Sequence, residues 1–458
     1  MLNLVKRQCF WATAIAVSIG TLWLIVPDPV VGPGLVVLFL GVIAVRNRSH
    51  ILSIAFVIFS FFRIHEVFPF LVPLKLPLLL ALATFLSLAW SVSFGRVRPF
   101  WDPLFLPFIV FFALVSLGIL SSSNVGNSSA YWTGTYAKIC LMIFAIAWSL
   151  RREEDLRVGL RSILLAAGTV AVVALSNKLN GVGLVEGTRV TIGRDIGSVL
   201  GDPNDLSLVL LFGASFAVAA ATGRGLPRLD RVFGLGVYIA VAAAVVATQS
   251  RGGLLGLAAI TGVFVAEHVK SKSLMIGLAS LVFIALFVFA DIDGRQSGGA
   301  YDAGIDESAM GRIYAWSAAL RMALDNPMTG VGLDNFYLNY FFYSDIWDGK
   351  NHAVHSTWFG VLAETGILGF AAFLWMIVAI FRGIRGATKA LDEHAQPSPI
   401  LSATLRGLFG GFVGFCVSGS FLTQAFTWPI YIILALTVAT ARITVSTNPN
   451  NLLTPKGC

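Results

Sequence analysis

The feature that most constrains this chain is a succession of apolar runs, each long enough to cross a lipid bilayer. A membrane-spanning helix needs about 20 mostly apolar residues. Runs of this kind begin near residues 9, 30, 51, 74, 103, 130, 157, 203, 231, 252, 274, 356, 402 and 424. The second, tenth and last are short or broken by Gly or Pro, so the sequence predicts an all-α polytopic integral membrane protein with about 12–14 transmembrane helices.

The composition agrees with a membrane protein. Of 458 residues, 57% are hydrophobic and 12% are charged, whereas soluble domains carry about 25% charged residues. The net charge of +8 stands in short clusters between apolar runs, and no nucleic-acid-binding motif accompanies it, so no nucleic-acid partner is expected. Lys6 and Arg7 precede an apolar run that lacks a small-residue cleavage site, which predicts an uncleaved first helix. The four cysteines show neither a metal-binding nor a disulfide spacing.

The distribution of Lys and Arg predicts the orientation, because cytoplasmic loops carry an excess of these residues. With the N-terminus inside, the loops that return to the cytoplasm contain Arg46 and Arg48; Arg96 and Arg98; Arg151, Arg152 and Arg157; Arg224, Arg228 and Arg231; Lys270 and Lys272; and Arg382, Arg385 and Lys389. The outward turns PDPVVGP, SSSNVGNSS and GSFLTQAFTW contain none. Both termini are therefore expected in the cytoplasm.

Three segments on the predicted outer side contain arginine, although the topology rule disfavours it there. They are residues 180–202, with Arg189 and Arg194; the turn QSRGG, with Arg251; and residues 291–353, with Arg295, Arg312 and Arg321. An anionic ligand at the outer face would account for these cations.

Residues 291–353 form the one long extramembrane loop of the predicted topology. Its second half, GRIYAWSAALRMALDN, places apolar residues at helical spacing, namely Ile313, Trp316, Leu320 and Leu324. We expect an amphipathic helix that lies on the outer membrane surface. No internal repeat and no second domain is visible, so residues 1–458 are expected to form a single membrane domain.

The segment GRDIGSVLGDPNDLS, residues 193–207, combines arginine with a helix start. Asp202 followed by Pro203 is typical of an N-cap and a first helical turn. One interpretation is that this pair only begins a helix. The other is that the outward N-terminus, with its free N–H groups and positive dipole end, binds an anion together with Arg194. Arg189 is the reserve candidate.

The turn TQSRGG holds Arg251 close to the membrane surface, and Gly252 and Gly253 permit a tight turn there. Arg251 either reaches the lipid headgroups or has a specific partner, because a cation near a membrane span is costly. A guanidinium donates in a planar fork, which suits the oxygens of a phosphate.

Two histidines precede the apolar run of HAVHSTWFGVLAETGILG. A helix that starts near residue 356 would place His355 at its N-terminus, where the dipole and nearby arginines lower the pKa of the ring and keep it neutral. A neutral imidazole can act as a general base. A capping role for His355, and His352 as the base, are the alternatives. Glu364 lies nine residues further on, half a helical turn out of phase, and is expected to be structural.

Two weaker patterns also stand near predicted span ends. Asp291 and Asp293 resemble a DxD metal motif, but they close a span, so no metal site is predicted there. Arg63, His65 and Glu66 form either a proton relay or a local ion pair, and the ion pair is the preferred interpretation.

Together the segments GRDIGSVLGDPNDLS, TQSRGG, GRIYAWSAALRMALDNPMTGVG and HSTWFGVLAETGILG resemble, in this order, the O-antigen ligase and Wzy-type O-antigen polymerase superfamily. The resemblance covers residues 185–380, and the first half of the chain matches only as hydrophobic spans. It implies a GT-C-like, metal-independent glycosyltransferase without a cofactor. Such an enzyme lies in the bacterial cytoplasmic (inner) membrane with its active site facing the periplasm.

The resemblance also implies the substrates and the site residues. The enzyme would transfer a glycan from an undecaprenyl-diphosphate-linked donor to a hydroxyl acceptor, either lipid A-core in a ligase or a lipid-linked glycan in an O-antigen or exopolysaccharide polymerase. The functional arginines and histidine of the family correspond to Arg194, Arg251 and His355, with Arg312 in a GR…W pattern. One extra residue before the Pro-Asn pair leaves Arg189 as an alternative to Arg194.

The chemistry of these residues agrees with the resemblance. Arginines would stabilise the departing diphosphate, grooves between spans would hold the polyprenyl tail among membrane lipids, and direct attack by the acceptor oxygen would invert the anomeric carbon. The rival class is a membrane transporter or flippase of lipid-linked glycans. It predicts inverted repeats and charges near the membrane midplane, but the sequence shows no repeat and places its charges at the outer rim.

Overall fold

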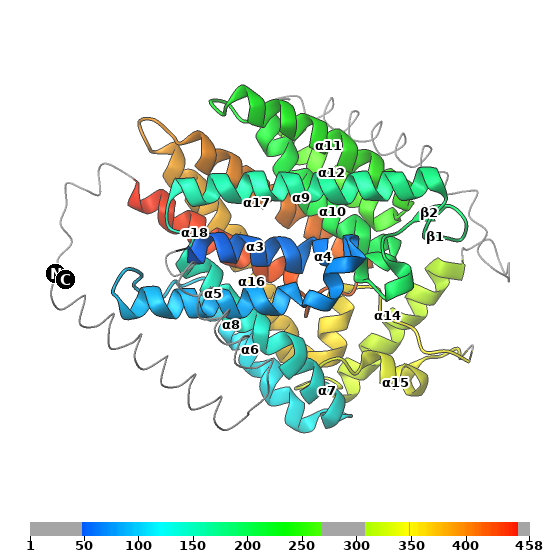
Figure 1. Ribbon diagram of the computed structural model, residues 1–458. Coiled ribbons are helices and arrows are strands. Elements are labelled where there is room, and N and C mark those ends of the chain that lie inside the picture. Colours follow the sequence, from blue (N-terminus) through cyan, green and yellow to red (C-terminus); the bar gives the residue numbers. More distant parts are fainter. Residues whose placement is uncertain (1–47, 268–306, 348, 448–458) are drawn as a thin grey trace, which may run out of the picture.

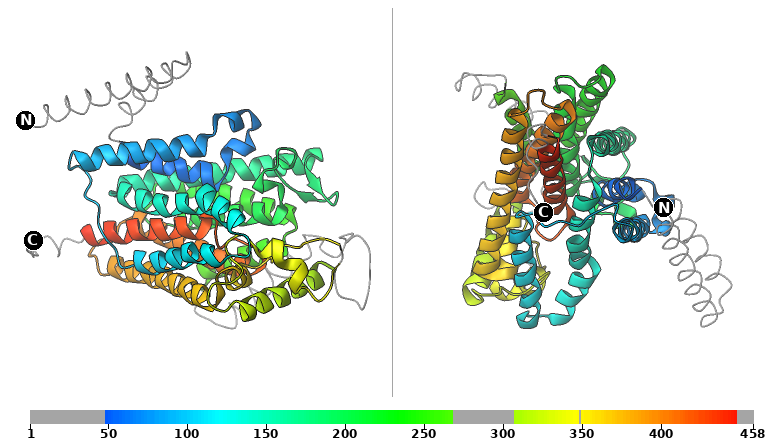
Figure 2. Two further views of the ribbon diagram at one scale, coloured as in Figure 1. Left: turned by 90° about the horizontal axis from the view of Figure 1, so that it is seen from below. Right: turned by 90° about the vertical axis from the view of Figure 1, so that its left-hand side faces the viewer.

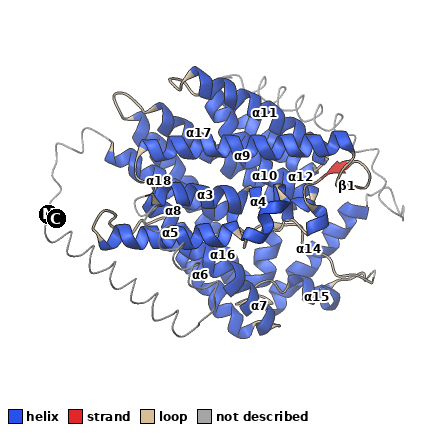
Figure 3. Ribbon diagram, viewed as in Figure 1, coloured by secondary structure: helices blue, strands red, loops and turns tan. Residues whose placement is uncertain are grey.

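The computed structural model describes residues 48–267, 307–347 and 349–447. They fold into a bundle of helices with one short β-hairpin (Figures 1 and 3). The helices of the bundle are α3 (Ser49–Phe61), α5 (Leu76–Ser93), α6 (Phe105–Gly118), α8 (Ala137–Ser149), α9 (Glu153–Asn180), α10 (Pro203–Ala221), α11 (Arg228–Thr248), α12 (Arg251–Ala266), α16 (Thr357–Asp392), α17 (Pro399–Ser418) and α18 (Trp428–Ser446).

Shorter elements connect these helices. They are α4 (Ile64–Val67), η1 (Pro69–Leu74), η2 (Ile119–Ser121), α7 (Val125–Tyr131), η3 (Trp132–Tyr136), η4 (Arg194–Ile196), η5 (Val199–Gly201), α14 (Glu307–Asp325), α15 (Phe336–Tyr343) and η6 (Gly419–Phe421). Strands β1 (Leu184–Val185) and β2 (Arg189–Val190) pair antiparallel, with Val185 opposite Arg189.

Eight helical segments of the described chain are long and apolar enough to cross a membrane, and three further apolar helices are shorter. Each of them begins close to one of the apolar runs in the sequence. The runs that begin near residues 9, 30 and 274 lie outside the described residues, as do Asp291 and Asp293. The prediction of an all-α polytopic membrane protein is confirmed.

The arginine-rich loops before α6, α9 and α11 gather at one end of the bundle together with the C-terminal part of α16, which carries Arg382, Arg385 and Lys389, and we call this the basic end. There the guanidinium of Arg151 donates to the carbonyl of Arg96, and the hydroxyl of Ser398 bonds the carboxylate of Glu153. The opposite end, the site end, carries the hairpin, η4, η5, α14 and α15 (Figures 1 and 2). Of the arginines predicted to face outward, the described ones therefore lie away from the basic loops, and Arg295 lies outside the described residues.

Helix α10 is the centre of the bundle and packs against α9, α11, α12 and α17. Its span is 78% buried, compared with 22% for α5, so α10 is enclosed by helices while α5 lies at the edge of the described bundle. Small residues permit this close packing. A Cβ on Gly213 would lie 2.3 Å from the Cβ of Ala167, and one on Gly234 would lie 2.9 Å from the carbonyl oxygen of Ala217.

Helix α14 is the helix expected in the long loop, and it packs against α16. Its packed face is rich in alanine, with Ala315, Ala318, Ala319 and Met322 buried. The larger side chains of the predicted stripe, Ile313, Leu320 and Leu324, are exposed. The small residues thus allow α14 to pack closely against α16, and the large apolar side chains point away from the bundle.

Gly366 interrupts α16 with a φ of 68°. The segment that approaches this glycine is the turn after α14. A Cβ at Gly366 would lie 2.6 Å from the carbonyl oxygen of Pro327, and the N–H of Ile367 donates to that oxygen. The kink therefore anchors the end of α14 to α16.

Candidate functional site

Three helices begin side by side at the site end: α10, α12 and α16. Each has a polar N-cap, because the side chains of Asp202, Ser250 and Ser356 accept from backbone N–H groups of the first turn. Capping leaves the remaining N–H groups of each first turn and the positive dipole end directed out of the helix. Three such ends together form a region suited to negative charge.

Asn204 holds the first of these helix starts against the second. Its Oδ1 accepts from Nη2 of Arg189 at 3.1 Å and from the hydroxyl of Ser250 at 2.9 Å. Ser250 is the cap of α12, so one amide oxygen joins the first turn of α10, the hairpin and the start of α12. The sequence reasoning missed this role of Asn204.

Gln424 holds the start of α16 against α10 from the other side. Its backbone N–H donates to Oγ1 of Thr357 at 3.2 Å, and its Nε2 donates to Oδ1 of Asp205 at 2.6 Å. The hydroxyl of Thr357 in turn donates to the carbonyl of Leu422 at 2.7 Å. Asp205 and Gln424 were not singled out in the sequence. Asp205 is a polar residue in the first turn of an apolar helix, and Gln424 is a polar residue in a turn predicted to face outward; the sequence offers no further indication of their role.

Arg251 is the first residue of α12 and is half-buried. The sequence suggested that Gly252 and Gly253 make the turn before α12, but the turn residue is Gln249, with a φ of 51°. The glycines lie in the first turn of α12 and permit close contact. A Cβ on Gly252 would meet the Cβ of Phe421 at 3.1 Å, and one on Gly253 would meet Oγ of Ser207 at 2.5 Å.

Residues 421–424 therefore separate the arginine from the histidine of the site. Gly252, next to Arg251, contacts Phe421, while Thr357, two residues after His355, bonds Leu422 and Gln424. Arg251 begins α12, His355 directly precedes the cap of α16, and both helices contact η6.

His355 stands in the left-handed region, with a φ of 47°, directly before the cap of α16. Burial is the main cause that lowers the pKa of His355 below its ordinary value of 6.5, and the charges of Arg312 and His352 lower it further. Asp202 acts in the opposite direction. The sequence predicted a lowered pKa from the helix dipole and arginines, whereas burial is the larger cause.

Helix α14 positions Arg312 near His355. One turn after it, Nε1 of Trp316 donates to the carbonyl of Val354 at 3.1 Å, and the indole stacks on Phe359 with ring centroids 5.2 Å apart. Residues four apart lie on one helix face, so Arg312 and Trp316 both face the residues that lead into α16. This geometry explains why the charge of Arg312 acts on His355.

Arg189 and Arg194 occupy different environments. Arg189 is only 7% exposed; besides Asn204 its guanidinium donates to the carbonyl of Thr248 at 3.2 Å and lies 3.8 Å from Glu186. Arg194 is exposed, and its Nη1 donates to the carbonyl of Gly201 at 3.4 Å, directly before the α10 cap.

His352 and Glu364 have packing and capping contacts. The ring of His352 meets that of Tyr340 edge-on, with centroids 5.3 Å apart. The carboxylate of Glu364 accepts from the backbone N–H groups of Asp334 at 3.0 Å and Phe336 at 3.2 Å, and so holds the start of α15. This agrees with the structural role expected for Glu364.

Arg63, His65 and Glu66 form the local ion pair that the sequence favoured. Nε of Arg63 donates to Glu66 at 2.6 Å, and Nε2 of His65 lies 3.5 Å from the same carboxylate. The hydroxyl of Ser198 also donates to Glu66 at 2.5 Å. The pair therefore ties α4 to the loop that carries Arg194.

The fold and the site define a multi-pass membrane protein with a cationic, histidine-bearing site at one end of its bundle. Residues 236–374 match the family model described as O-antigen ligase. The chain is also 24% identical over 361 residues to exopolysaccharide production protein ExoQ of Rhizobium meliloti (strain 1021), a match that covers 70% of this chain and 78% of that protein. The predicted resemblance to the O-antigen ligase and polymerase family is thereby confirmed, and both matches support a membrane enzyme of polysaccharide biosynthesis.

Proposed function

We propose that this protein transfers a glycan from an undecaprenyl-diphosphate-linked donor to a hydroxyl acceptor at the outer face of the cytoplasmic membrane. The observation that carries this proposal is the set of three capped helix N-termini at one end of the bundle, where Arg251 begins α12 and the charge of Arg312 acts on His355. The positive-inside rule supports the orientation, because the arginine-rich loops lie at the opposite end of the bundle.

The cations and helix ends would bind the diphosphate of the donor. Arg194, Arg251 and Arg312 supply guanidinium groups, and the first turns of α10, α12 and α16 supply N–H groups and positive dipole ends. These groups stabilise the negative charge that grows on the diphosphate as its bond to the sugar breaks, so the proposed chemistry is metal-independent. Arg189, buried against Asn204 and Thr248, positions the start of α12 in this scheme.

His355 would be the general base. Its lowered pKa keeps the imidazole neutral at pH 7, and a neutral ring can take the proton of the acceptor hydroxyl. The acceptor oxygen then attacks the anomeric carbon, the carbon–oxygen bond to the diphosphate breaks, and the proton remains on His355. Attack opposite the leaving group inverts the anomeric configuration.

The relative whose name refers to exopolysaccharide production supports a polymerase as well as a ligase. The two differ in the acceptor, which is lipid-linked glycan for a polymerase and lipid A-core for a ligase. A transfer assay with purified protein, a defined lipid-diphosphate donor and each acceptor in turn tests the proposal. Product with either acceptor supports a transferase and assigns the acceptor, whereas donor movement across vesicles without transfer contradicts the proposal.

A further inference from the structure

The starts of α10 and α16 are joined through a single residue, Gln424. Its Nε2 donates to Oδ1 of Asp205 at 2.6 Å, and its backbone N–H donates to Oγ1 of Thr357 at 3.2 Å. Asp202 is the N-cap of α10, three residues before Asp205, and His355 stands two residues before Thr357. This link therefore brings the cap of α10 close to His355, the residue to which the base of the reaction is assigned.

Charged groups from three segments act on His355. Burial disfavours the protonated ring and lowers its pKa, and the charges of Arg312 on α14 and of His352 in the preceding loop act in the same direction. The carboxylate of Asp202, at the start of α10, raises the pKa. Within the described chain, Asp202 is thus the negative charge that favours protonation of His355.

The carboxylate of Asp202 uses only one of its oxygens for the helix cap. Oδ1 accepts from the backbone N–H groups of Asn204 at 2.7 Å and Asp205 at 3.3 Å. Oδ2 has no hydrogen-bond donor among the described residues, and the side chain is exposed. One oxygen therefore remains available for a positively charged imidazole ring.

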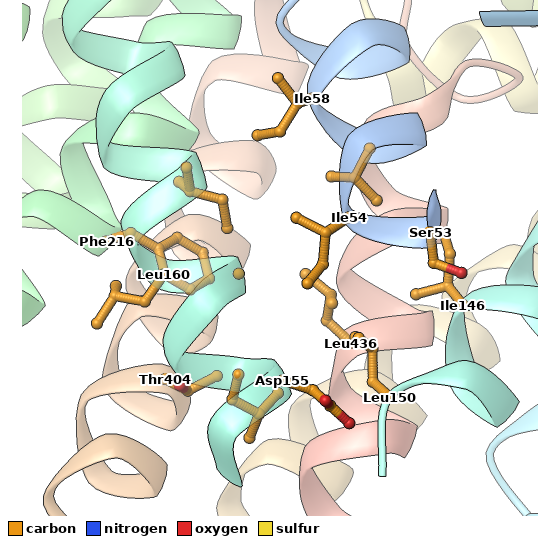
Figure 4. Close-up of a pocket in the computed structure, with 14 residues that line it drawn as sticks. Ser53, Ile54, Ile58, Ile146, Leu150, Asp155, Leu160, Phe216, Thr404 and Leu436 are labelled. Carbon is orange, nitrogen blue, oxygen red and sulfur yellow. The ribbon is translucent and has the colours of Figure 1, made fainter. Parts of the chain in front are cut away.

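The two oxygens of Asp155 are divided in this way at the basic end of the bundle. Asp155 lies in the first turn of α9, beside the apolar cavity shown in Figure 4. Its Oδ2 accepts from the backbone N–H groups of Arg151 and Arg152 at 2.9 and 3.0 Å, while its Oδ1 lies 3.7 Å from Nε2 of His50. A carboxylate at a helix start of this fold can therefore hold backbone N–H groups with one oxygen and face a histidine with the other.

We propose that Asp202 assists the general base, because its carboxylate stabilises the imidazolium that forms when His355 takes the proton of the acceptor hydroxyl. The inference rests on the proposed function and deepens it. In this step the proton moves from the acceptor oxygen to the ring, the oxygen bonds to the anomeric carbon, and the bond from that carbon to the diphosphate breaks. Asp202 keeps its charge throughout and acts through His355, so it is a positioning residue. A carboxylate repels the diphosphate of the donor, so its place among the arginines serves the base and not donor binding.

The test replaces Asp202 by asparagine in the full-length protein in detergent. Asparagine is as good an N-cap as aspartate, so Asp202→Asn keeps the start of α10 and loses only the charge. The first measurement is the pH dependence of the reaction of His355 with diethyl pyrocarbonate, which acylates the neutral ring and not the protonated one, located by tandem mass spectrometry. It needs neither donor nor acceptor. We expect the midpoint to move to lower pH in Asp202→Asn, because the protonated ring loses the nearby negative charge.

The matched control is Asp195→Asn. Asp195 is an exposed carboxylate of η4, in the same loop, and its charge does not act on His355. The midpoint should therefore remain unchanged in this variant. Asp202→Ser, which also caps a helix without a charge, should behave like Asp202→Asn.

The second measurement is the rate–pH profile of glycan transfer. A pair of exposed charges contributes up to about fivefold to an equilibrium, so the plateau rate of Asp202→Asn should fall up to about fivefold. Its acidic limb should move to lower pH, and the KM for the donor should not rise. An unchanged or higher midpoint, or a fall in melting temperature without any shift in pH, overturns the role of Asp202. Absence of transfer by the unaltered protein contradicts the proposed function instead, and the modification of His355 then still decides whether Asp202 acts on this ring.

Discussion

Replacement of Asn204 by alanine is the sharpest test of how the site is held together. The change removes the oxygen that accepts from the buried guanidinium of Arg189 and from the hydroxyl of Ser250. A hydrogen bond to a charged group contributes about 1.5–3 kcal/mol and a neutral one about 0.5–1.5 kcal/mol. The expected loss in free energy of unfolding is therefore about 2–4 kcal/mol, and the start of α12, with Arg251, loses its link to α10.

Two measurements test this prediction, the melting temperature and the rate of glycan transfer. The melting temperature of the purified variant in detergent should fall by several degrees, and glycan transfer should fall more steeply than the folded fraction, because Arg251 is no longer positioned. Asn204→Asp keeps an acceptor oxygen beside Arg189 and should retain most of both properties. Asn180→Ala, which removes an exposed amide bonded only within its own helix, should change neither. Unchanged melting and transfer in Asn204→Ala would refute the assigned role.

Four further predictions concern the site and the topology. His355→Ala should slow transfer by about 10²–10⁴-fold with donor binding retained, while His352→Ala costs much less; near-normal transfer in His355→Ala contradicts the assignment. In the unaltered protein, transfer should persist at the ordinary histidine value of 6.5 and fall only at more acidic pH, because the lowered pKa of His355 keeps the base neutral until then; His355→Ala should lose this acidic limb in a rate–pH profile. Arg251→Lys should lose most activity because a point charge cannot replace the planar fork, and full activity would exclude bidentate diphosphate binding. A cysteine at Ser123 should react with an impermeant reagent in intact cells and one at Arg152 should not; the reverse pattern would invert the topology.

The sequence predicted those parts of the structure that depend on local properties. Apolar runs long enough to span a bilayer became helices because a backbone in lipid must satisfy its own hydrogen bonds. The start of α10 was also predictable, since Asp202 and Pro203 are adjacent in the chain and act on the same turn. The ion pair of Arg63 and Glu66 spans only three residues and was foreseen for the same reason.

Contacts between distant segments escaped the sequence analysis. Asn204 accepts a hydrogen bond from Ser250, and Asp205 accepts one from Gln424. The sequence around each residue does not indicate which residue will be its partner. The packing of α14 could not be predicted either. Helical spacing identifies a stripe of large apolar side chains, but it does not show whether that stripe packs against α16 or faces the lipid. Here the small residues pack and the large ones remain exposed.

The sequence alone thus determined that this chain spans a membrane, which loops carry the basic residues, and which arginines and histidines are out of place on the opposite side. Hydropathy and charge are summed along the chain, so they can be read without a fold. Only the tertiary structure decided that Arg189 is buried against Asn204 and Thr248 while Arg194 stays exposed, and that the helices next to Arg251 and His355 both contact η6. These outcomes depend on which helices pack together, and that choice is made by contacts between residues far apart in the chain, such as Asp205 and Gln424, which are 219 positions apart.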